Sequence, residues 1–203
     1  MVIDAIDISN IEAAIQAGGK IWENDLLADF KQKIKAYYRG ILGEQCCYCR
    51  KNSLGEFKFV LDIEHILPKS VFSHLMFTMY NLSVSCKRCN MSIKNQDVSF
   101  LSDVTAVTAN PKDTSLYKFI HPNFDDYFSH LNFYTKIENQ QKIIKYTIVA
   151  DSAKGQFTYD YFKLEELETD SINMAQGVKE AEDISEIIKP EIAKRIEDLL
   201  KNK

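Results

Sequence analysis

The chain has 203 residues, of which 45% are hydrophobic, a composition that suits a folded domain with a sizeable core and argues against a disordered segment. Its net charge of −4 argues against a protein that holds nucleic acid through its whole surface, because such binding relies mainly on basic side chains. No apolar stretch approaches a membrane span, and the N-terminus lacks the layout of a signal peptide. We therefore expect a cytoplasmic protein without membrane attachment.

The first predicted region, residues 1–43, has helical patterns. Ser9 and Glu12 have the spacing of a capping box and predict a short helix that ends before a glycine pair. From Ile21 onward an apolar residue recurs at every fourth position, which predicts a longer packing helix that ends near Gly43. The residues of this stripe are Trp22, Leu26, Phe30, Ile34, Tyr38 and Leu42.

Four of the five cysteines form two C-x-x-C pairs in the second predicted region, residues 44–97. Pairs with this spacing can share one tetrahedral ion, so we predict a structural zinc site made of Cys46, Cys49, Cys86 and Cys89. Buried free thiols and a redox pair are the alternatives, although no thioredoxin-like βαβ pattern surrounds either pair. We assign no role to Cys47. The gap between the pairs is long enough to hold a catalytic hairpin.

Polar residues with catalytic chemistry lie in and beside that gap. Glu64 and His65 follow one another near the end of a strand predicted over 56–62. A carboxylate beside an imidazole can bind a hard cation while the imidazole faces a water molecule. Asn90 directly follows the second cysteine pair, and its amide oxygen suits Mg²⁺ or Mn²⁺. Asp62 shares the strand face of Glu64 and is interpreted only as a residue that tunes the site.

The ordered string C-x-x-C, D-I-E-H-I-L-P-K-S, N-L, C-x-x-C-N resembles the HNH (ββα-metal) endonuclease motif in its zinc-stabilised form, over about a quarter of the chain. The resemblance implies an α+β fold, mostly helical around a small zinc-stabilised core. It also implies that His65 is the general base, that Asn81 braces the loop, and that Glu64 and Asn90 bind the catalytic cation. The sequence departs from the family pattern at two positions: Glu64 replaces the Asp or His often found there, and the last position is Asn90. Both side chains can bind a hard cation, and the glutamate has the longer reach.

A second stretch, His121-Pro-Asn-Phe-Asp-Asp126 followed by His130, resembles small antiphage nucleases of the Septu PtuB and retron-associated type. This looser resemblance implies a partner ATPase of the PtuA kind and a role in defence against phage. The window from Glu44 to Gln96 has a local charge of +3 within an acidic chain, which favours a nucleic-acid substrate there, DNA foremost. We consider Lys87, Arg88 and Lys94 as phosphate contacts, with a solvated surface role equally open for each.

The histidines and aromatic residues outside the motif have simpler interpretations. We expect His74 to pack among its apolar neighbours and His121 to begin a turn at Pro122. The tyrosines and phenylalanines between residues 117 and 134 are expected to form core, although base stacking is the alternative. For the whole chain, the alternative to a nuclease is a zinc-knuckle module that binds nucleic acid or protein without chemistry.

The third predicted region, residues 98–203, combines several short elements. We expect a loop over Val98 to Asp113, a hairpin made of Phe133 to Ile137 and Lys142 to Ala150, and a turn over Asp151 to Gly155. Helices are expected to follow. Their apolar stripes are Ile184, Ile187 and Ile188, and then Ile192, Ile196, Leu199 and Leu200, with Pro190 in the first turn of the last helix.

Overall fold

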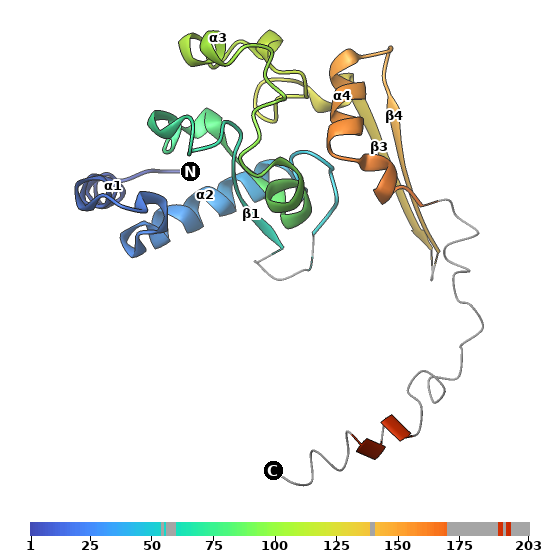
Figure 1. Ribbon diagram of the computed structural model, residues 1–203, viewed down its shortest axis with the longest axis horizontal. Coiled ribbons are helices and arrows are strands. Elements are labelled where there is room, and N and C mark those ends of the chain that lie inside the picture. Colours follow the sequence, from blue (N-terminus) through green and yellow to red (C-terminus); the bar gives the residue numbers. More distant parts are fainter. Residues whose placement is uncertain (54, 56–59, 139–140, 170–190, 193, 196–203) are drawn as a thin grey trace. The chain divides into compact units, whose positions relative to one another are not determined.

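A computed structural model describes residues 1–53, 55, 60–138, 141–169, 191–192 and 194–195 (Figure 1). The protein combines helices with two small sheets, so the expected α+β class is confirmed at this level. Two compact units are present: Met1–Phe133 with Tyr146–Leu167, and Tyr134–Lys145 with Glu168–Lys203. No helix in the described part of the chain has the length and hydrophobicity needed to cross a membrane. Most of the helical region expected after residue 184 lies outside the described residues.

The first helix, α1 (Ala5–Ala17), begins earlier than predicted. Its cap is Asp4, whose carboxylate accepts hydrogen bonds from the backbone N–H groups of Ile6 and Asp7, while the Asp7 carboxylate accepts from the backbone of Asp4. The ammonium of Lys33 pairs with both carboxylates, at 2.8 Å and 2.7 Å. Two aspartates three residues apart thus form the capping box one turn before the expected serine and glutamate, and a cation from another helix stabilises them.

The predicted helix from Ile21 is broken into three pieces. Two 3-10 turns, Ile21–Glu23 and Asp25–Leu27, precede the helix α2 (Ala28–Ile41). Asn24 causes the break, because its backbone is extended and its side chain caps the second turn through the N–H of Leu26. Only the later part of the stripe faces the core: Phe30, Ile34 and Tyr38 are buried. Trp22 lies in the first 3-10 turn and is not part of this buried face of α2.

The central hairpin pairs β1 (Leu61–His65) with β2 (Leu82–Cys86) in antiparallel register, with Leu61 opposite Cys86 and His65 opposite Leu82. The strand predicted over 56–62 therefore continues three residues further than expected, and residues 56–59 lie outside the described part of the chain. Helix α2 packs against both strands (Figure 1). A π-helix, Arg88–Lys94, follows β2 directly. The hairpin therefore follows the first cysteine pair, Cys46 and Cys49, and ends at Cys86, the first residue of the second pair.

The region after the hairpin contains more helix than expected. The predicted loop includes the helix α3 (Val104–Ala109), which Asp103 caps through the N–H of Ala106. The predicted hairpin is confirmed as β3 (Leu131–Glu138) and β4 (Gln141–Ile148). The expected turn after residue 150 ends at Ser152, where α4 (Ala153–Tyr161) begins. Short 3-10 turns complete the described chain at Ser73–Leu75, Met79–Asn81, Thr114–Leu116, Tyr127–Ser129 and Leu164–Leu167.

Aromatic side chains build much of the core in the first unit. The ring of Tyr48 stacks on Phe162 at a centroid distance of 4.2 Å, and Phe100 stacks on Phe119 at the same distance. All four side chains are buried. Within the 117–134 stretch, Tyr117, Phe119 and Tyr127 are buried as expected, whereas Phe124, Phe128 and Tyr134 are exposed. The core interpretation therefore holds for only part of that stretch.

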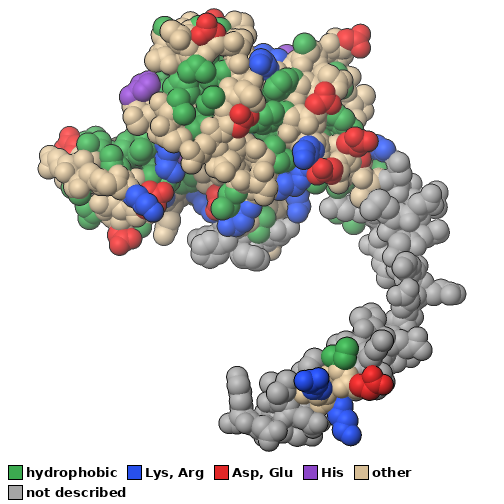
Figure 2. All heavy atoms as spheres, viewed as in Figure 1, with side chains coloured by type: hydrophobic (Ala, Val, Ile, Leu, Met, Phe, Trp, Pro, Cys, Tyr) green, Lys and Arg blue, Asp and Glu red, His purple; other side chains and the backbone are tan. Residues whose placement is uncertain are grey.

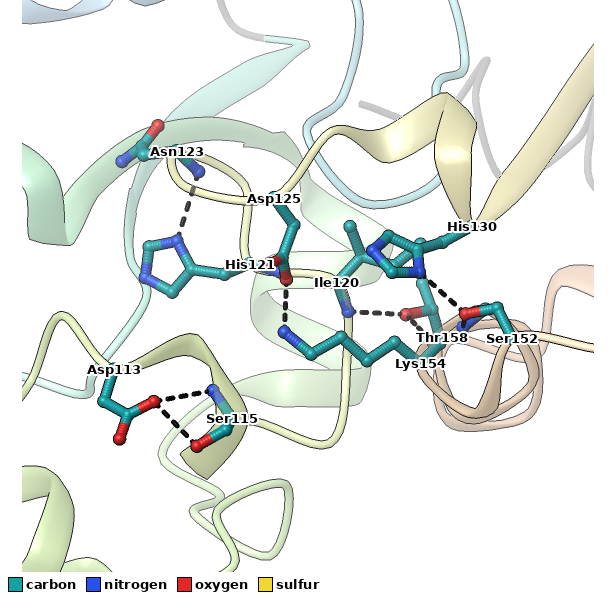
Figure 3. A network of polar contacts seen from close by, with 11 residues as sticks. Asp113, Ser115, Ile120, His121, Asn123, Asp125, His130, Ser152, Lys154 and Thr158 are labelled. Carbon is teal, nitrogen blue, oxygen red and sulfur yellow. Dashed lines mark hydrogen bonds and ion pairs between the residues drawn. The ribbon is translucent and has the colours of Figure 1, made fainter. Parts of the chain in front are cut away.

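A network of polar contacts fixes the loop that precedes β3 onto α4 (Figure 3). The carboxylate of Asp125 accepts a hydrogen bond from the backbone N–H of His121 and pairs with Lys154 at 2.6 Å. The hydroxyl of Thr158 accepts from the backbone N–H of Ile120 at 2.9 Å. Two backbone bonds to the His121 carbonyl close a turn, so the turn expected at this histidine is confirmed.

Candidate active site and metal centre

The four cysteines of the two C-x-x-C pairs come together in the structure. Their sulfur atoms all lie within 4.8 Å of one another, and all four residues are buried. The Sγ atoms of Cys49 and Cys86 are 3.8 Å apart. A tetrahedral zinc ion with Zn–S bonds of about 2.3 Å separates its sulfur ligands by roughly 3.8 Å. The cluster of Cys46, Cys49, Cys86 and Cys89 therefore has the donors, the burial and the spacing to bind one zinc ion.

Groups from distant parts of the chain hold the first cysteine pair in place. The N–H of Cys47 donates to the carbonyl of Val84 on β2, at 3.0 Å. The hydroxyl of Tyr127 donates to the carbonyl of Tyr48 at 2.9 Å. Cys47 is itself buried outside the four-sulfur cluster, and burial raises the pKa of its thiol well above the ordinary value. The cluster thus joins the central hairpin to the loop before β3.

His65 lies at the end of β1 with its ring orientation fixed on two sides. Its Nε2 atom is 3.0 Å from the carbonyl of Met76, and the ring of Trp22 packs edge-on against it at 4.4 Å. Burial lowers the pKa of the imidazole to about 4, so His65 is neutral near pH 7. In a neutral ring that donates Nε2–H to a carbonyl, the lone pair is on Nδ1. The geometry therefore suits a base that acts through Nδ1.

A cavity of about 560 Å³ opens beside this histidine. His65, Glu64 and Asn90 all line it, so the structure brings the predicted base and both predicted cation ligands to one space. The segment between α1 and α2 also lines this cavity, with Lys20 and Trp22 among the lining residues. Near-buried polar groups that converge on one concave space are the usual arrangement of an active site.

The carboxylate of Glu64 is buried and already has two partners. Lys94 contacts its Oε1 atom at 2.8 Å, and the hydroxyl of Tyr48 donates to the same oxygen at 3.1 Å. Burial raises the pKa of Glu64, and the neighbouring Lys94 ammonium opposes that rise. Because both contacts use Oε1, Oε2 is the atom that remains to bind a cation.

Lys94 occupies a different environment from the one expected for a phosphate contact. Its side chain is only 1% exposed, and its ammonium donates to the carbonyl of His65 at 2.9 Å in addition to pairing with Glu64. A buried carboxylate requires a nearby opposite charge, and Lys94 supplies it. The phosphate-binding interpretation of Lys94 does not agree with this burial. The residue instead ties the π-helix to the end of β1.

The two asparagines of the motif have different surroundings. Asn90, in the π-helix, donates from Nδ2 to the carbonyl of Ile63 at 3.3 Å, which leaves its Oδ1 atom as the oxygen donor. Asn81 is buried, accepts from the N–H of Leu67 at 2.7 Å, and donates to the carbonyls of Leu67 and Leu75 at 3.1 Å and 3.2 Å. These bonds brace the loop that follows His65. Asn81 acts on that loop and does not line the described cavity.

The other two basic candidates are engaged with protein groups. Lys87 is exposed and pairs with Asp62 at 3.3 Å. Arg88 donates to the carbonyls of Phe162 and Lys163 at 2.7 Å and 2.8 Å, and pairs with Glu166 at 2.8 Å. Arg88 thus holds the end of α4 against the second cysteine pair. The phosphate-binding roles of both residues stay predictions.

The remaining histidines are separate from the cavity. His121 is buried, and its Nδ1 atom accepts a hydrogen bond from the backbone N–H of Asn123 at 3.2 Å (Figure 3). His74 is exposed, so its expected packing role is wrong. The 3-10 turn Ser73–Leu75 directs Phe72 and Leu75 inward and leaves the histidine between them in solvent.

Comparison with curated proteins gives one relative of this chain. The chain is similar to the Septu protein PtuB of Bacillus thuringiensis, with 25% identity over 154 residues. The matched region covers 76% of this chain and 47% of that protein, so the chain spans about half the length of the curated relative it matches. No family model matches the sequence, and no solved structure matches it.

Sequence reasoning missed the N-terminal contribution to the site. Trp22 belongs to the stripe of apolar residues that recur at every fourth position, and that spacing does not indicate a contact with His65. The carbonyl of Met76 is a backbone group that no sequence pattern could identify. One signal was present: the glycine pair Gly18 and Gly19, both with positive φ, turns the chain just before the cavity wall begins.

Proposed function

We propose that this protein is a metal-dependent endonuclease of the HNH type that hydrolyses phosphodiester bonds in nucleic acid, with DNA the foremost substrate. One observation carries the proposal. A neutral His65, anchored through Nε2 to the carbonyl of Met76, lines the same cavity as the oxygen donors Glu64 and Asn90. The four-cysteine cluster at the base of the hairpin supports it, because a structural zinc ion there would fix the hairpin that carries the base.

The residues of the cavity have distinct parts in the reaction. Nδ1 of His65 accepts a proton from the water that attacks phosphorus, while the contacts from Met76 and Trp22 keep the ring in place. Glu64 and Asn90 would hold Mg²⁺ or Mn²⁺, which supplies positive charge for the phosphoryl oxygens and the leaving group when bound. Lys94 fixes Glu64 from the side opposite the free carboxylate oxygen.

We also propose that the protein is the nuclease subunit of an antiphage defence system. The similarity to the Septu protein PtuB supports this role, as does the resemblance of the 121–126 stretch to small antiphage nucleases. The resemblance further suggests an ATPase partner of the PtuA kind. The C-terminal helical region is the proposed docking segment, and deletion of the residues after Ile184, most of which lie outside the described residues, should abolish co-purification with the ATPase but preserve zinc content. Retained association would place the partner elsewhere on the chain.

Cleavage assays test the nuclease proposal. The full chain, alone and with the partner ATPase, should cut DNA in the presence of Mg²⁺ or Mn²⁺ and remain inactive with EDTA. The His65→Ala variant should lose at least about 100-fold in rate, as expected for a missing general base, and keep its zinc. The matched control is His74→Ala, because that histidine is exposed and outside the described cavity. Equal loss in both variants, or full activity in His65→Ala, would reject the role of His65.

A zinc-knuckle binding module is the second candidate, favoured by the burial of the cysteine cluster alone. It requires no chemistry at the cavity. Binding to nucleic acid or protein would then be the same in the wild type and His65→Ala, and no cleavage would occur with any metal or partner. The two candidates therefore differ in one measurement, the metal-dependent cleavage rate.

A further inference from the structure

Two lysines that have no part in the proposed chemistry line the His65 cavity, and they come from separate segments of the chain. Lys20 comes from the segment between α1 and α2, and its side chain is exposed. Lys69 comes from the loop after β1 and has a side chain that is 38% exposed. Its ion pair with Glu23 is long, at 3.6 Å, and the glutamate is 54% exposed, so solvent weakens that pair. Both ammonium groups can therefore bind an anion that enters the cavity, Lys20 from solvent and Lys69 in place of its weak pair with Glu23.

The basic surface continues into a second cavity of about 320 Å³. This cavity shares Trp22, Asp62 and Ile63 with the first, so the two adjoin. Lys31 and Lys35, from α2, also line it. Figure 2 shows Lys and Arg side chains along the lower border of the main body in that view, with acidic side chains among them. Lysines thus border one continuous space that passes His65.

These lysines are close enough to oppose one another's charge. Burial lowers the pKa of Lys31, and the nearby Lys69 lowers it further, while Glu23 and Asp25 act in the other direction. Burial also lowers the pKa of Lys35, with Asp62 opposing the change and Arg39 and Lys87 adding to it. The ion pairs of Lys69 with Glu23 and of Lys35 with Asp62 are long, at 3.6 Å and 3.7 Å, so these acidic groups offset only part of the positive charge. A ligand with several regularly spaced negative charges can interact with what remains.

We propose that Lys20, Lys69 and Lys31 bind the sugar-phosphate backbone of a nucleic-acid strand that crosses the His65 cavity. The segment before α2 is then part of the substrate site. This inference rests on the proposed nuclease function and adds binding residues from outside the cysteine-bracketed hairpin. A polyphosphate strand fits better than a single phosphate group, because the lysines extend over two adjoining cavities.

Binding measurements on uncleaved substrate test the inference. In the His65→Ala background of the full chain, fluorescence anisotropy with labelled single-stranded and duplex DNA gives Kd as a function of NaCl concentration. The double change Lys20→Ala with Lys69→Ala should weaken binding about 10-fold or more at low salt. It should also reduce the slope of log K against log salt by about 1.8 for duplex DNA, since each phosphate contact contributes about 0.9. Lys20→Arg with Lys69→Arg should preserve both quantities.

The matched control removes the same charge elsewhere. Lys112 and Lys163 are exposed and line neither cavity, so Lys112→Ala with Lys163→Ala should leave Kd and the slope close to those of the parent. Equal effects of the two double changes would overturn the inference, because net charge would then explain the loss. Displacement of DNA by poly-glutamate at equal charge concentration would also overturn it, in favour of an acidic protein partner.

Separate measurements of DNA cleavage and DNA binding distinguish a failure of the lysine contacts from a failure of the nuclease proposal. If wild-type protein cuts DNA and the Lys20, Lys69 double variant cuts with unchanged KM, the nuclease stands and the lysine contacts are rejected. If the lysine change weakens DNA binding but no condition yields cleavage, the binding surface stands and the nuclease is rejected. Absence of any DNA or RNA binding would reject the inference directly.

Discussion

Two regions of this molecule contain a buried histidine in nearly the same electrostatic state. Burial lowers the pKa of His65 and of His121 to about 4 in each case. His65 uses Nε2 for its backbone contact and lines a cavity, whereas His121 uses Nδ1 to accept from Asn123 and packs its ring against Phe124 at 4.6 Å. Burial and pKa therefore do not distinguish a candidate base from a structural histidine. The ring nitrogen in use and the open space beside it do.

The largest expected effect comes from the four-cysteine cluster, which lies beside the hairpin that carries His65. Cys86→Ser should remove the zinc and disorder the β1–β2 hairpin, because structural zinc sites contribute on the order of 10 kcal/mol to the folded state. Metal analysis and thermal unfolding by circular dichroism measure the two losses. Cys47→Ser is the control, since this cysteine is buried outside the cluster. A Cys86→Ser protein with full zinc content and an unchanged Tm would contradict the assignment.

A smaller effect is the loss of folding stability at acidic pH, to which His121 should contribute together with His65. The unfolded imidazole titrates near 6.5 and the folded one near 4, so the unfolded state binds more protons between these values. The stabilising contribution is present above about pH 6.5 and is lost as pH falls toward 4. His121 should account for about 2 kcal/mol of the unfolding free energy lost between pH 7 and pH 5.

Urea unfolding at the two pH values measures this loss. His121→Phe should lose less stability on acidification than the wild type, whereas His74→Phe should behave as the wild type because that histidine is exposed. An unchanged pH dependence in His121→Phe would show that the buried imidazole is not the source.

The smallest expected effect is a change in kcat when the aromatic residue beside each histidine is replaced. Trp22→Leu removes the edge contact with His65 and should lower kcat about tenfold, or about 1.4 kcal/mol of barrier, with little change in KM. Trp22→Phe should restore part of the rate. The counterpart in the other region, Phe124→Leu, removes a ring stacked on His121 and should leave kcat unchanged. Equal kcat values for both leucine variants would show that Trp22 does not position the base.

The parts of the site that sequence could predict are those with local signals. The cysteine pairs and the hairpin after residue 130 follow from spacing within a few residues, and the structure contains them, whereas β1 ends three residues later than the strand predicted over 56–62. Lys94 was misread because its environment depends on Glu64, which is distant in sequence and buried beside it. A lysine near a basic motif looks like a surface cation until the burial of its partner is known.

The N-terminal region also shows what sequence periodicity cannot predict. The stripe from Trp22 to Tyr38 has the period of one helix, but Asn24 has a strong local preference to cap a new turn. That single cap outweighs the periodicity and turns Trp22 toward the central hairpin. Periodicity predicted the packing face of α2 and could not predict the cavity wall.

The π-helix from Arg88 to Lys94 constrains how this segment can change in length. Its wide turn brings both Asn90 and Lys94 to the end of β1. Deleting one residue between them would rotate Lys94 around the helix axis, away from Glu64, and leave two buried charges without partners. The exposed residues Met91 and Ser92 can therefore vary in identity, whereas an insertion or deletion there would be far more damaging than any substitution.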